Sequence, residues 1–253
     1  MLGKIDISAS IVLFNEDPVI LQKAVNNFIE APLKKKLFLI DNSPTNQLEQ
    51  LASNNNNNVE YIHVGKNIGF GAAHNLVIDK INSDYHLILN PDVEFDSSVF
   101  NDLIHQFELN QNLSMVSPKV IYPNGKIQYT CRKKPTIKGL LSRRMGLFKD
   151  YVNERQYLNR DLSKSFSPEF IHGCFMLFKT KEFIDLRGFD ERYFLYMEDA
   201  DICRKINTSG KEILYYPKAQ ITHIHRRGSA KKIKLLFYHT SSAIKYFRKW
   251  GFS

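Results

Sequence analysis

The sequence predicts an α/β fold in which a mostly parallel central sheet is flanked by helices. The first observation is that segments with strand and helix character alternate through the first 110 residues. This is the order expected when helices connect parallel strands. The second observation is the run Leu37-Phe38-Leu39-Ile40, which is apolar at every position. Such a run is typical of a strand that is covered on both faces.

Each element of this half follows from its local pattern. After a break and helix cap at residues 15–18, Leu21, Ala24, Val25 and Phe28 recur at the spacing of one helical face. Strands are expected at residues 7–14, 37–40, 59–64 and 85–89. Further helices are expected to end near Ala52, to include Leu76, Val77 and Ile81, and to include Leu103, Ile104 and Phe107.

The second half begins with a change of character. Cationic residues cluster between residues 131 and 167 and the periodicity weakens, so we expect a helical or mobile insertion. Order returns with a strand over residues 170–178, a helix that includes Ile202 and Ile206, and a strand over 213–216. Residues 231–250 combine an apolar face with many Lys and Arg residues, which predicts a basic amphipathic helix.

Composition restricts the function classes. Positive side chains exceed negative ones by 9, so an anionic partner is expected: nucleic acid, nucleotide phosphate or anionic lipid. No apolar run is long enough to cross a membrane, and Asp6 and Ser8 interrupt any signal-peptide core. We therefore expect a cytoplasmic protein. The three widely spaced cysteines form no zinc or disulfide pattern and are expected to be buried thiols.

Polar residues follow two of the expected strands. Asp41 comes directly after one strand, and Asn90-Pro91-Asp92 ends another. A glycine-containing loop, residues 67–75, lies between them but has neither dinucleotide-binding nor P-loop spacing. Because ligands bind at the carboxyl ends of parallel strands, these side chains are candidates for a shared site.

A run of acid, Glu198-Asp199-Ala200-Asp201, interrupts this basic chain. Carboxylates this close raise one another's pKa values, and folds keep them where a base, a metal ligand or an acceptor is needed. The alternative is a solvated helix start, where acids favour the helix dipole. Further on, His223 and His225 lie in an expected strand, and we expect at most one of them to take part in a shared site.

Taken in order, these motifs resemble the inverting nucleotide-sugar transferases of glycosyltransferase family 2. The likeness is greatest to the rhamnosyltransferase-like branch of bacterial surface-polysaccharide synthesis. It covers nearly the whole chain and includes the following segments: Ile11-Val12-Leu13-Phe14-Asn15, Ile40-Asp41-Asn42-Ser43, Asn67-Ile68-Gly69-Phe70, Gly188-Phe189-Asp190-Glu191, Glu198-Asp199-Ala200-Asp201 and Ser242-Ala243-Ile244-Lys245-Tyr246-Phe247.

This resemblance implies a GT-A, Rossmann-like fold. The glycosyltransferase domain is expected to span residues 1–230, with a nucleotide-sugar half at 1–110 and an acceptor and catalytic half at 168–230. A C-terminal helix would follow at 231–253. That helix is expected either to bind an anionic membrane surface, at the inner face of the bacterial plasma membrane, or to pack on the domain.

The resemblance also assigns donor-binding residues. Asp41 resembles the acid that hydrogen-bonds the nucleotide base, and Phe14 and Asn15 lie beside that base. Asn67 and Gly69 belong to the loop near the nucleotide and the sugar.

Asn90-Pro91-Asp92 takes the place of the family's acidic metal motif. Asn at its first position removes one charge, so Asp92 is the expected direct ligand and Asn90 a donor-site residue. His223 resembles a histidine that completes the coordination, with His225 a weaker candidate. An oxygen and an imidazole ligand suit Mn²⁺ or Mg²⁺.

In the acidic run, Asp199 resembles the family's catalytic base. Glu198 and Asp201 are expected to orient it, to bind the acceptor or to tune its pKa. One base opposite the leaving group implies inversion at the anomeric carbon. Arg226, Arg227, Lys231 and Lys232 either face the phosphates or are solvated.

Three functions remain open at this point. The resemblance favours transfer of L-rhamnose from dTDP-L-rhamnose to a lipid-linked glycan, and a UDP-sugar such as UDP-galactofuranose, UDP-hexose or UDP-N-acetylhexosamine is the alternative donor. The third is a non-catalytic, basic nucleic-acid-binding protein. We expect no nucleic-acid partner, because aromatic residues are not interleaved with the basic cluster at residues 132–144.

Overall fold

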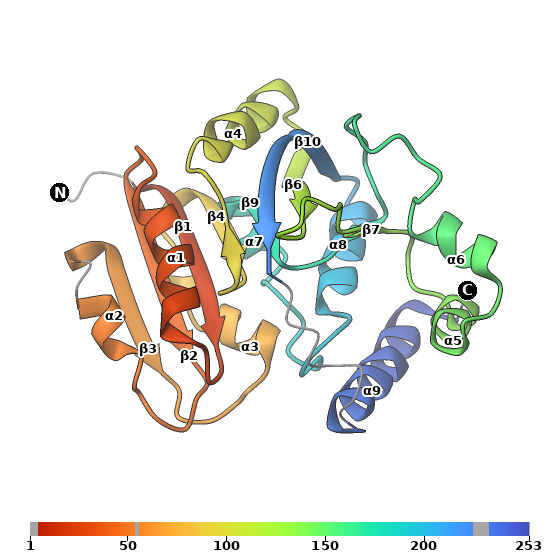
Figure 1. Ribbon diagram of the computed structural model, residues 1–253, viewed down its shortest axis with the longest axis horizontal. Coiled ribbons are helices and arrows are strands. Elements are labelled where there is room, and N and C mark those ends of the chain that lie inside the picture. Colours follow the sequence, from red (N-terminus) through yellow and green to blue (C-terminus); the bar gives the residue numbers. More distant parts are fainter. Residues whose placement is uncertain (1–4, 54–55, 225–232, 253) are drawn as a thin grey trace.

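The structure, a computed structural model, describes residues 5–53, 56–224 and 233–252. An eight-stranded sheet forms its centre, in the spatial order β3-β2-β1-β4-β9-β6-β10-β5 (Figure 1). The strands are β1 (Ile5–Leu13), β2 (Lys35–Asp41), β3 (Val59–His63), β4 (Ser83–Leu89), β5 (Val93–Glu94), β6 (Leu113–Ile121), β9 (Phe175–Lys179) and β10 (Glu212–His223).

Parallel pairing joins β3, β2, β1 and β4, whereas β9 runs antiparallel between β4 and β6. On the far side β10 is parallel to β6, and β5 pairs antiparallel with β10. The register aligns Leu13 with Asp41 and Asp41 with His63. The carboxyl ends of these strands therefore lie at one edge, as the sequence predicts.

Helices cover both faces of the sheet. They are α1 (Pro18–Ile29), α2 (Glu49–Ser53), α3 (Phe70–Asn75), α4 (Val99–Leu109), α5 (Ile137–Met145), α6 (Lys149–Arg155), α7 (Thr180–Asp185), α8 (Glu198–Thr208) and α9 (Ile233–Trp250). Short 3₁₀ turns lie at Asn56–Asn58 and Ile78–Lys80.

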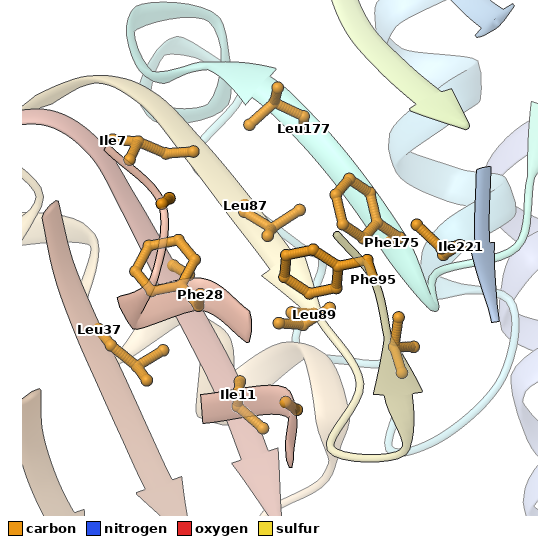
Figure 2. Packing of buried hydrophobic residues seen from close by; sticks show 14 of the residues in the cluster. Ile7, Ile11, Phe28, Leu37, Leu87, Leu89, Phe95, Phe175, Leu177 and Ile221 are labelled. Atoms are coloured by element: carbon orange, nitrogen blue, oxygen red, sulfur yellow. The ribbon is translucent and has the colours of Figure 1, made fainter. Parts of the chain in front are cut away.

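Two hydrophobic cores result, one on each face of the sheet. In β2, Leu37 and Leu39 belong to the core that contains α1 and α4, while Phe38 and Ile40 belong to the core that contains α7 and α8. Figure 2 shows part of the first core, where Phe28 of α1 packs over the sheet. The all-apolar run is therefore covered on both faces, as expected for a strand of this type.

The expected insertion is helical. It contains α5 and α6, and a two-stranded ribbon of β7 (Cys131–Arg132) and β8 (Phe170–Ile171) closes its base. The single strand predicted over residues 170–178 is wrong, because a turn at residues 172–174 separates β8 from β9. This turn is closed by a hydrogen bond from the Cys174 amide to the His172 carbonyl oxygen, 3.0 Å.

Two other expectations need correction. β6 was not predicted, since Ser114, Ser117 and Pro118 interrupt its apolar pattern although most of the strand is buried. The helix after Gly69 ends at Asn75, so Val77 and Ile81 pack from the irregular segment that follows it.

The C-terminal helix α9 packs on the domain through its second half. Ser242, Ala243, Tyr246 and Phe247 are buried there. Residues of its first half, Ile233 among them, are largely exposed. All three cysteines are buried and free. Within the described part of the chain, no helix combines the length and apolar character needed to span a membrane.

Candidate active site

At the carboxyl end of β2, Asp41 is fully buried. Its carboxylate accepts hydrogen bonds from the Tyr61 hydroxyl, 2.5 Å, and from the Ser43 amide, 2.8 Å. The hydroxyl of Ser43 in turn accepts a bond from the Asn15 amide, 2.8 Å. The structure thus brings Asp41 and Asn15 together through Ser43, and the neighbouring Phe14 ring is exposed. The contact of these residues with a nucleotide base stays a prediction.

The loop that begins at Asn67 is docked on the segment before α8. The Asn67 side chain accepts a bond from the Gly69 amide, 3.0 Å, and the Phe70 amide donates to the Phe194 carbonyl oxygen, 3.0 Å. Gly69 has a φ of 99°. A Cβ atom added there would lie 2.4 Å from the Phe194 oxygen. Only glycine therefore allows this close approach of two distant segments.

Two residues in the left-handed region lead into α8. Tyr196 has a φ of 70° and Met197 a φ of 71°. Such conformations cost free energy in residues other than glycine and cluster at functional sites. The turn places Glu198 and Asp199 in the first turn of α8, close to the docked loop. A Cβ atom on Gly71 would lie 3.8 Å from the Glu198 Cβ atom.

Asp199 is held by His172, a residue that the sequence analysis did not single out. The His172 Nδ1 atom lies 3.1 Å from the Asp199 Oδ2 atom. Burial alone would raise the pKa of Asp199. The hydrogen bond from His172, the charge of His172 and the backbone hydrogen bonds from Ala200 and Gly173 together outweigh burial, so the pKa is lowered. Burial lowers the pKa of His172, and Asp199 opposes that effect.

Glu198 behaves in the opposite way. Burial and the neighbouring charge of Asp199 raise its pKa well above the ordinary value. Its Oε2 atom is buried and has no hydrogen-bond partner among the described residues. The surroundings therefore push the pKa values of the two neighbouring carboxyl groups apart, that of Asp199 down and that of Glu198 up, which is the separation typical of acid–base sites.

Asp201 points away from this pair. Its carboxylate is fully buried. It accepts bonds from the Tyr193 hydroxyl, 3.1 Å, from Lys249, 2.8 Å, and from the Trp250 indole nitrogen, 2.6 Å. Lys249 and Trp250 lie in α9, so Asp201 fastens that helix to α8 rather than lining the cavity at Asp199.

The expected metal ligands lie together. His223, at the end of β10, places its Nε2 atom 3.2 Å from the Asp92 Oδ1 atom. Its Nδ1 atom is 3.0 Å from the side-chain oxygen of Gln128. Burial lowers the pKa of His223, but contacts with Cys174 and Asp92 outweigh burial and raise it to about 10. Gln128 and Cys174 were not predicted as site residues.

The donor set fits a hard divalent cation. No cluster of three His, Cys, Asp or Glu side chains suited to a metal occurs among the described residues. Mg²⁺ and similar ions, however, are commonly held by one or two protein ligands, with phosphates and water completing the shell. Asp92 and His223 are such a pair. His225, with Arg226, Arg227, Lys231 and Lys232, lies outside the described residues.

The turn at residues 172–174 connects the two parts of the site. His172 contacts Asp199, and a Cβ atom on Gly173 would lie 3.7 Å from the Asp199 Cβ atom. The Cys174 carbonyl oxygen accepts a bond from the Asn90 amide, 3.0 Å. One end of this turn therefore contacts Asp199, and the other end contacts the segment that leads to Asp92.

A cavity opens beside Asp199. It holds about 750 Å³ of space, part of it open to solvent. Glu198, Asp199 and His172 form one side, and residues of α5, α6, α9 and the β7–β8 ribbon line other parts of it. Asp92 and His223 are not among the residues that line it.

Sequence comparison identifies relatives of the whole chain. Residues 8–187, more than half of the chain, match the family described as Glycosyl transferase family 2. The chain is 27% identical over 224 residues to N-acetylglucosaminyl-diphospho-decaprenol L-rhamnosyltransferase of Mycobacterium tuberculosis, with 82% of this chain and 73% of that protein covered. It is 23% identical over 237 residues to rhamnosyltransferase WbbL of Escherichia coli K12, with 89% and 87% covered.

Solved structures share the fold. A structure of GalNAc-T7 with UDP, GalNAc and Mn²⁺ superposes with a TM-score of 0.74 at 16% identity, over 97% of this chain and 48% of that one. The mannosyltransferase PcManGT from Pyrobaculum calidifontis, with GDP-Man and Mn²⁺, gives 0.67 at 16% identity, over 98% and 65%. The predicted GT-A fold and the resemblance to family 2 rhamnosyltransferases are confirmed.

Proposed function

The chain belongs to glycosyl transferase family 2, and we propose that it transfers a sugar from a nucleotide-activated donor to an acceptor hydroxyl with inversion at the anomeric carbon. The observation that carries the proposal is the unequal pair of carboxylates. The Asp199 carboxylate contacts His172, lines a cavity and has a lowered pKa, whereas the pKa of Glu198 is raised. An ionised carboxylate next to an acceptor cavity is suited to take a proton from a hydroxyl group.

In the proposed step the acceptor oxygen forms a bond to the anomeric carbon while the bond from that carbon to the nucleotide breaks. Asp199 takes the hydroxyl proton, and the nucleoside diphosphate leaves with the bonding electron pair. Attack and departure occur on opposite faces of the sugar, so one displacement inverts the configuration. His172 holds the Asp199 carboxylate in place by the 3.1 Å contact.

Asp92 and His223 would hold the Mn²⁺ or Mg²⁺ ion. Such an ion neutralises the charge that develops on a departing diphosphate. Both solved structures contain Mn²⁺, which supports a divalent ion here. Gln128 would keep the His223 ring in its orientation through the 3.0 Å contact at Nδ1.

The donor is proposed to be dTDP-L-rhamnose and the acceptor a lipid-linked sugar. Both relatives described above are named rhamnosyltransferases, and the mycobacterial protein is named for an N-acetylglucosaminyl-diphospho-decaprenol acceptor. Asp41, Asn15 and Asn67 would contact the nucleotide part of the donor. A UDP-sugar remains the alternative donor.

An anionic membrane is the proposed location of this acceptor. Ile137, Leu141 and Met145 of α5 are exposed at intervals of one helical turn. The basic residues Arg143 and Arg144 lie between Leu141 and Met145 in the same helix. Helices that combine an exposed apolar face with basic residues bind in the interface of anionic bilayers. α9, whose first half is largely exposed, lies next to α5 in the fold (Figure 1), and both helices line the same cavity.

The test is transfer with purified protein. With Mn²⁺, dTDP-L-rhamnose and the octyl diphosphate of N-acetylglucosamine, the expected product carries rhamnose with the anomeric configuration opposite to that of the donor, detected by NMR. Retention of configuration would overturn the inverting mechanism. A panel of dTDP-, UDP- and GDP-sugars identifies the donor, since a bound ligand raises the melting temperature. Stabilisation by a UDP-sugar alone would establish the alternative donor.

A further inference from the structure

The cavity that contains Asp199 holds a guanidinium group, that of Arg132, two of whose nitrogen atoms have no hydrogen-bond partner among the described residues. Arg132 ends the short strand β7, and its side chain lines the cavity. Its Nε and Nη1 atoms are buried, and neither has a hydrogen-bond partner among the described residues. Leaving donors of a charged group buried and unpaired is costly. The position is therefore suited to an anion that arrives with a ligand.

Two other cationic side chains that line the cavity have partners within the protein. Lys133 pairs with Glu154, and Arg155 donates to the Lys134 carbonyl oxygen. Arg143 of α5, by contrast, lines the cavity and is exposed. Burial lowers the pKa of Arg132, and the nearby charge of Arg143 lowers it further, to about 10. Arg132 is still charged at neutral pH.

In the described part of the chain, neither of the carboxyl groups that line the cavity with Arg132, those of Glu198 and Asp199, forms an ion pair with it. The pKa of Glu198 is raised by its burial and by the charge of Asp199, and the Asp199 carboxylate is engaged by His172. The Arg132 side of the cavity is thus positive, and the Asp199 side supplies a base. A molecule that occupies both sides carries an anionic group near the hydroxyl that reacts.

The donor diphosphate does not account for this position. Its expected place is at Asp92 and His223, which lie beyond the turn at residues 172–174 and do not line the cavity. An anion bound at Arg132 would therefore be distinct from the donor diphosphate and would lie in the same cavity as Asp199.

We propose that Arg132, assisted by Arg143, binds a phosphate group of the acceptor, so that the enzyme acts on a sugar that is joined to a diphosphate. This inference rests on the proposed function. A guanidinium presents parallel N–H donors that match two phosphate oxygens, which fixes the orientation of the ligand as well as binding it. Holding the diphosphate there places the attached sugar toward Asp199.

The first test measures binding without chemistry. Octyl diphosphate is titrated into the full chain in EDTA, so that no cation links it to Asp92 and His223, and the heat of binding is recorded. We expect Arg132→Gln to weaken binding about tenfold or more, the worth of a charged hydrogen bond. Arg144→Gln, which changes a basic residue of α5 outside the cavity, is expected to bind like the wild type. Failure of the wild type to bind, or undiminished binding by folded Arg132→Gln, would overturn the proposal.

Arg143→Gln keeps the test decisive if Arg132→Gln does not fold. It changes an exposed side chain, so the fold is expected to survive, and binding of octyl diphosphate should fall severalfold. Binding equal to that of the wild type would then count against the site.

The second test compares two acceptors that differ only in charge: the octyl diphosphate and the octyl glycoside of N-acetylglucosamine. Arg132→Gln should raise KM about tenfold for the diphosphate and leave KM for the glycoside and for the donor unchanged. An equal rise for both acceptors would contradict phosphate recognition. Donor hydrolysis without acceptor should stay at the wild-type rate in Arg144→Gln, whose side chain does not line the cavity. Lack of both hydrolysis and transfer in the wild type would instead refute the proposed function.

Discussion

At the residue scale, the site depends on the different surroundings of three neighbouring carboxyl groups, those of Glu198, Asp199 and Asp201. Glu198 and Asp199 are adjacent in sequence, but their pKa values shift in opposite directions, because only Asp199 has the hydrogen bond and the charge of His172 to offset its burial. Asp201, two positions further on, serves the packing of α9. Three similar side chains thus acquire three different environments within one helical turn.

His172 is expected to set the acid limit of the reaction. Its hydrogen bond helps to lower the pKa of Asp199 below the ordinary value, so the wild type keeps an ionised base as the pH falls. Removing the bond in His172→Ala lets burial dominate, and the pKa of Asp199 rises. The acid limb of the kcat/KM profile should therefore move to higher pH. An unchanged acid limb with only a lower plateau would show that His172 does not act through Asp199.

At the element scale, glycine contacts and short turns bring distant segments together. The loop at residues 67–70 docks on Phe194, and the turn at 172–174 joins the two parts of the site. These contacts place α3 and α8 against each other, so the donor loop and the acid pair are held in one arrangement.

Gly69→Ala tests the docking of this loop. A Cβ atom would meet the Phe194 oxygen at 2.4 Å and the residue would keep a φ of 99°. We expect the free energy of unfolding to fall by about 1–3 kcal/mol and donor binding to weaken. Gly125→Ala is the matched control, because Gly125 has a φ of 79° and no atom within 4 Å of an added Cβ. Equal losses in the two variants, measured by urea unfolding, would show that backbone conformation alone matters.

α5 is expected to hold the protein at an anionic bilayer. Changing Leu141 and Met145 together to Ser removes two exposed apolar side chains and should reduce sedimentation with phosphatidylglycerol vesicles. Val19 and Leu109, exposed on other helices, provide the matched control double variant. Retained sedimentation of the α5 variant, or an equal loss in the control, would contradict this orientation.

At the scale of the whole molecule, the fold could be predicted from the sequence, as could the meeting of strand-end residues at one edge of the sheet. Strand ends such as Asp41 and Asp92 follow clear apolar runs, so their place at one edge of the sheet is a local property. His172 and Arg132 could not be predicted, since their roles depend on contacts with α8 and α5 that are distant in sequence. His172 also lay within an apolar run that resembled one continuous strand.

β6 and the role of Asp201 were missed for related reasons. The Ser114 and Ser117 side chains are buried, and the Ser117 hydroxyl donates to the Phe175 carbonyl oxygen, so polar residues occupy a core strand. The Asp201 carboxylate accepts hydrogen bonds from Lys249 and Trp250, which lie near the C-terminal end of α9, far from Asp201 in sequence. Long-range pairing of this kind leaves no local signal.

The central claim, that Asp199 is the base and Glu198 a neutral acid, is tested most directly by comparing two isosteric variants. Rates of rhamnose transfer are measured for Asp199→Asn and Glu198→Gln with saturating donor and Mn²⁺. Asp199→Asn should lower kcat by about 100-fold or more, whereas Glu198→Gln, which replaces one neutral group by another, should lower it only severalfold. A larger loss in Glu198→Gln than in Asp199→Asn, with both variants folded, would contradict the account.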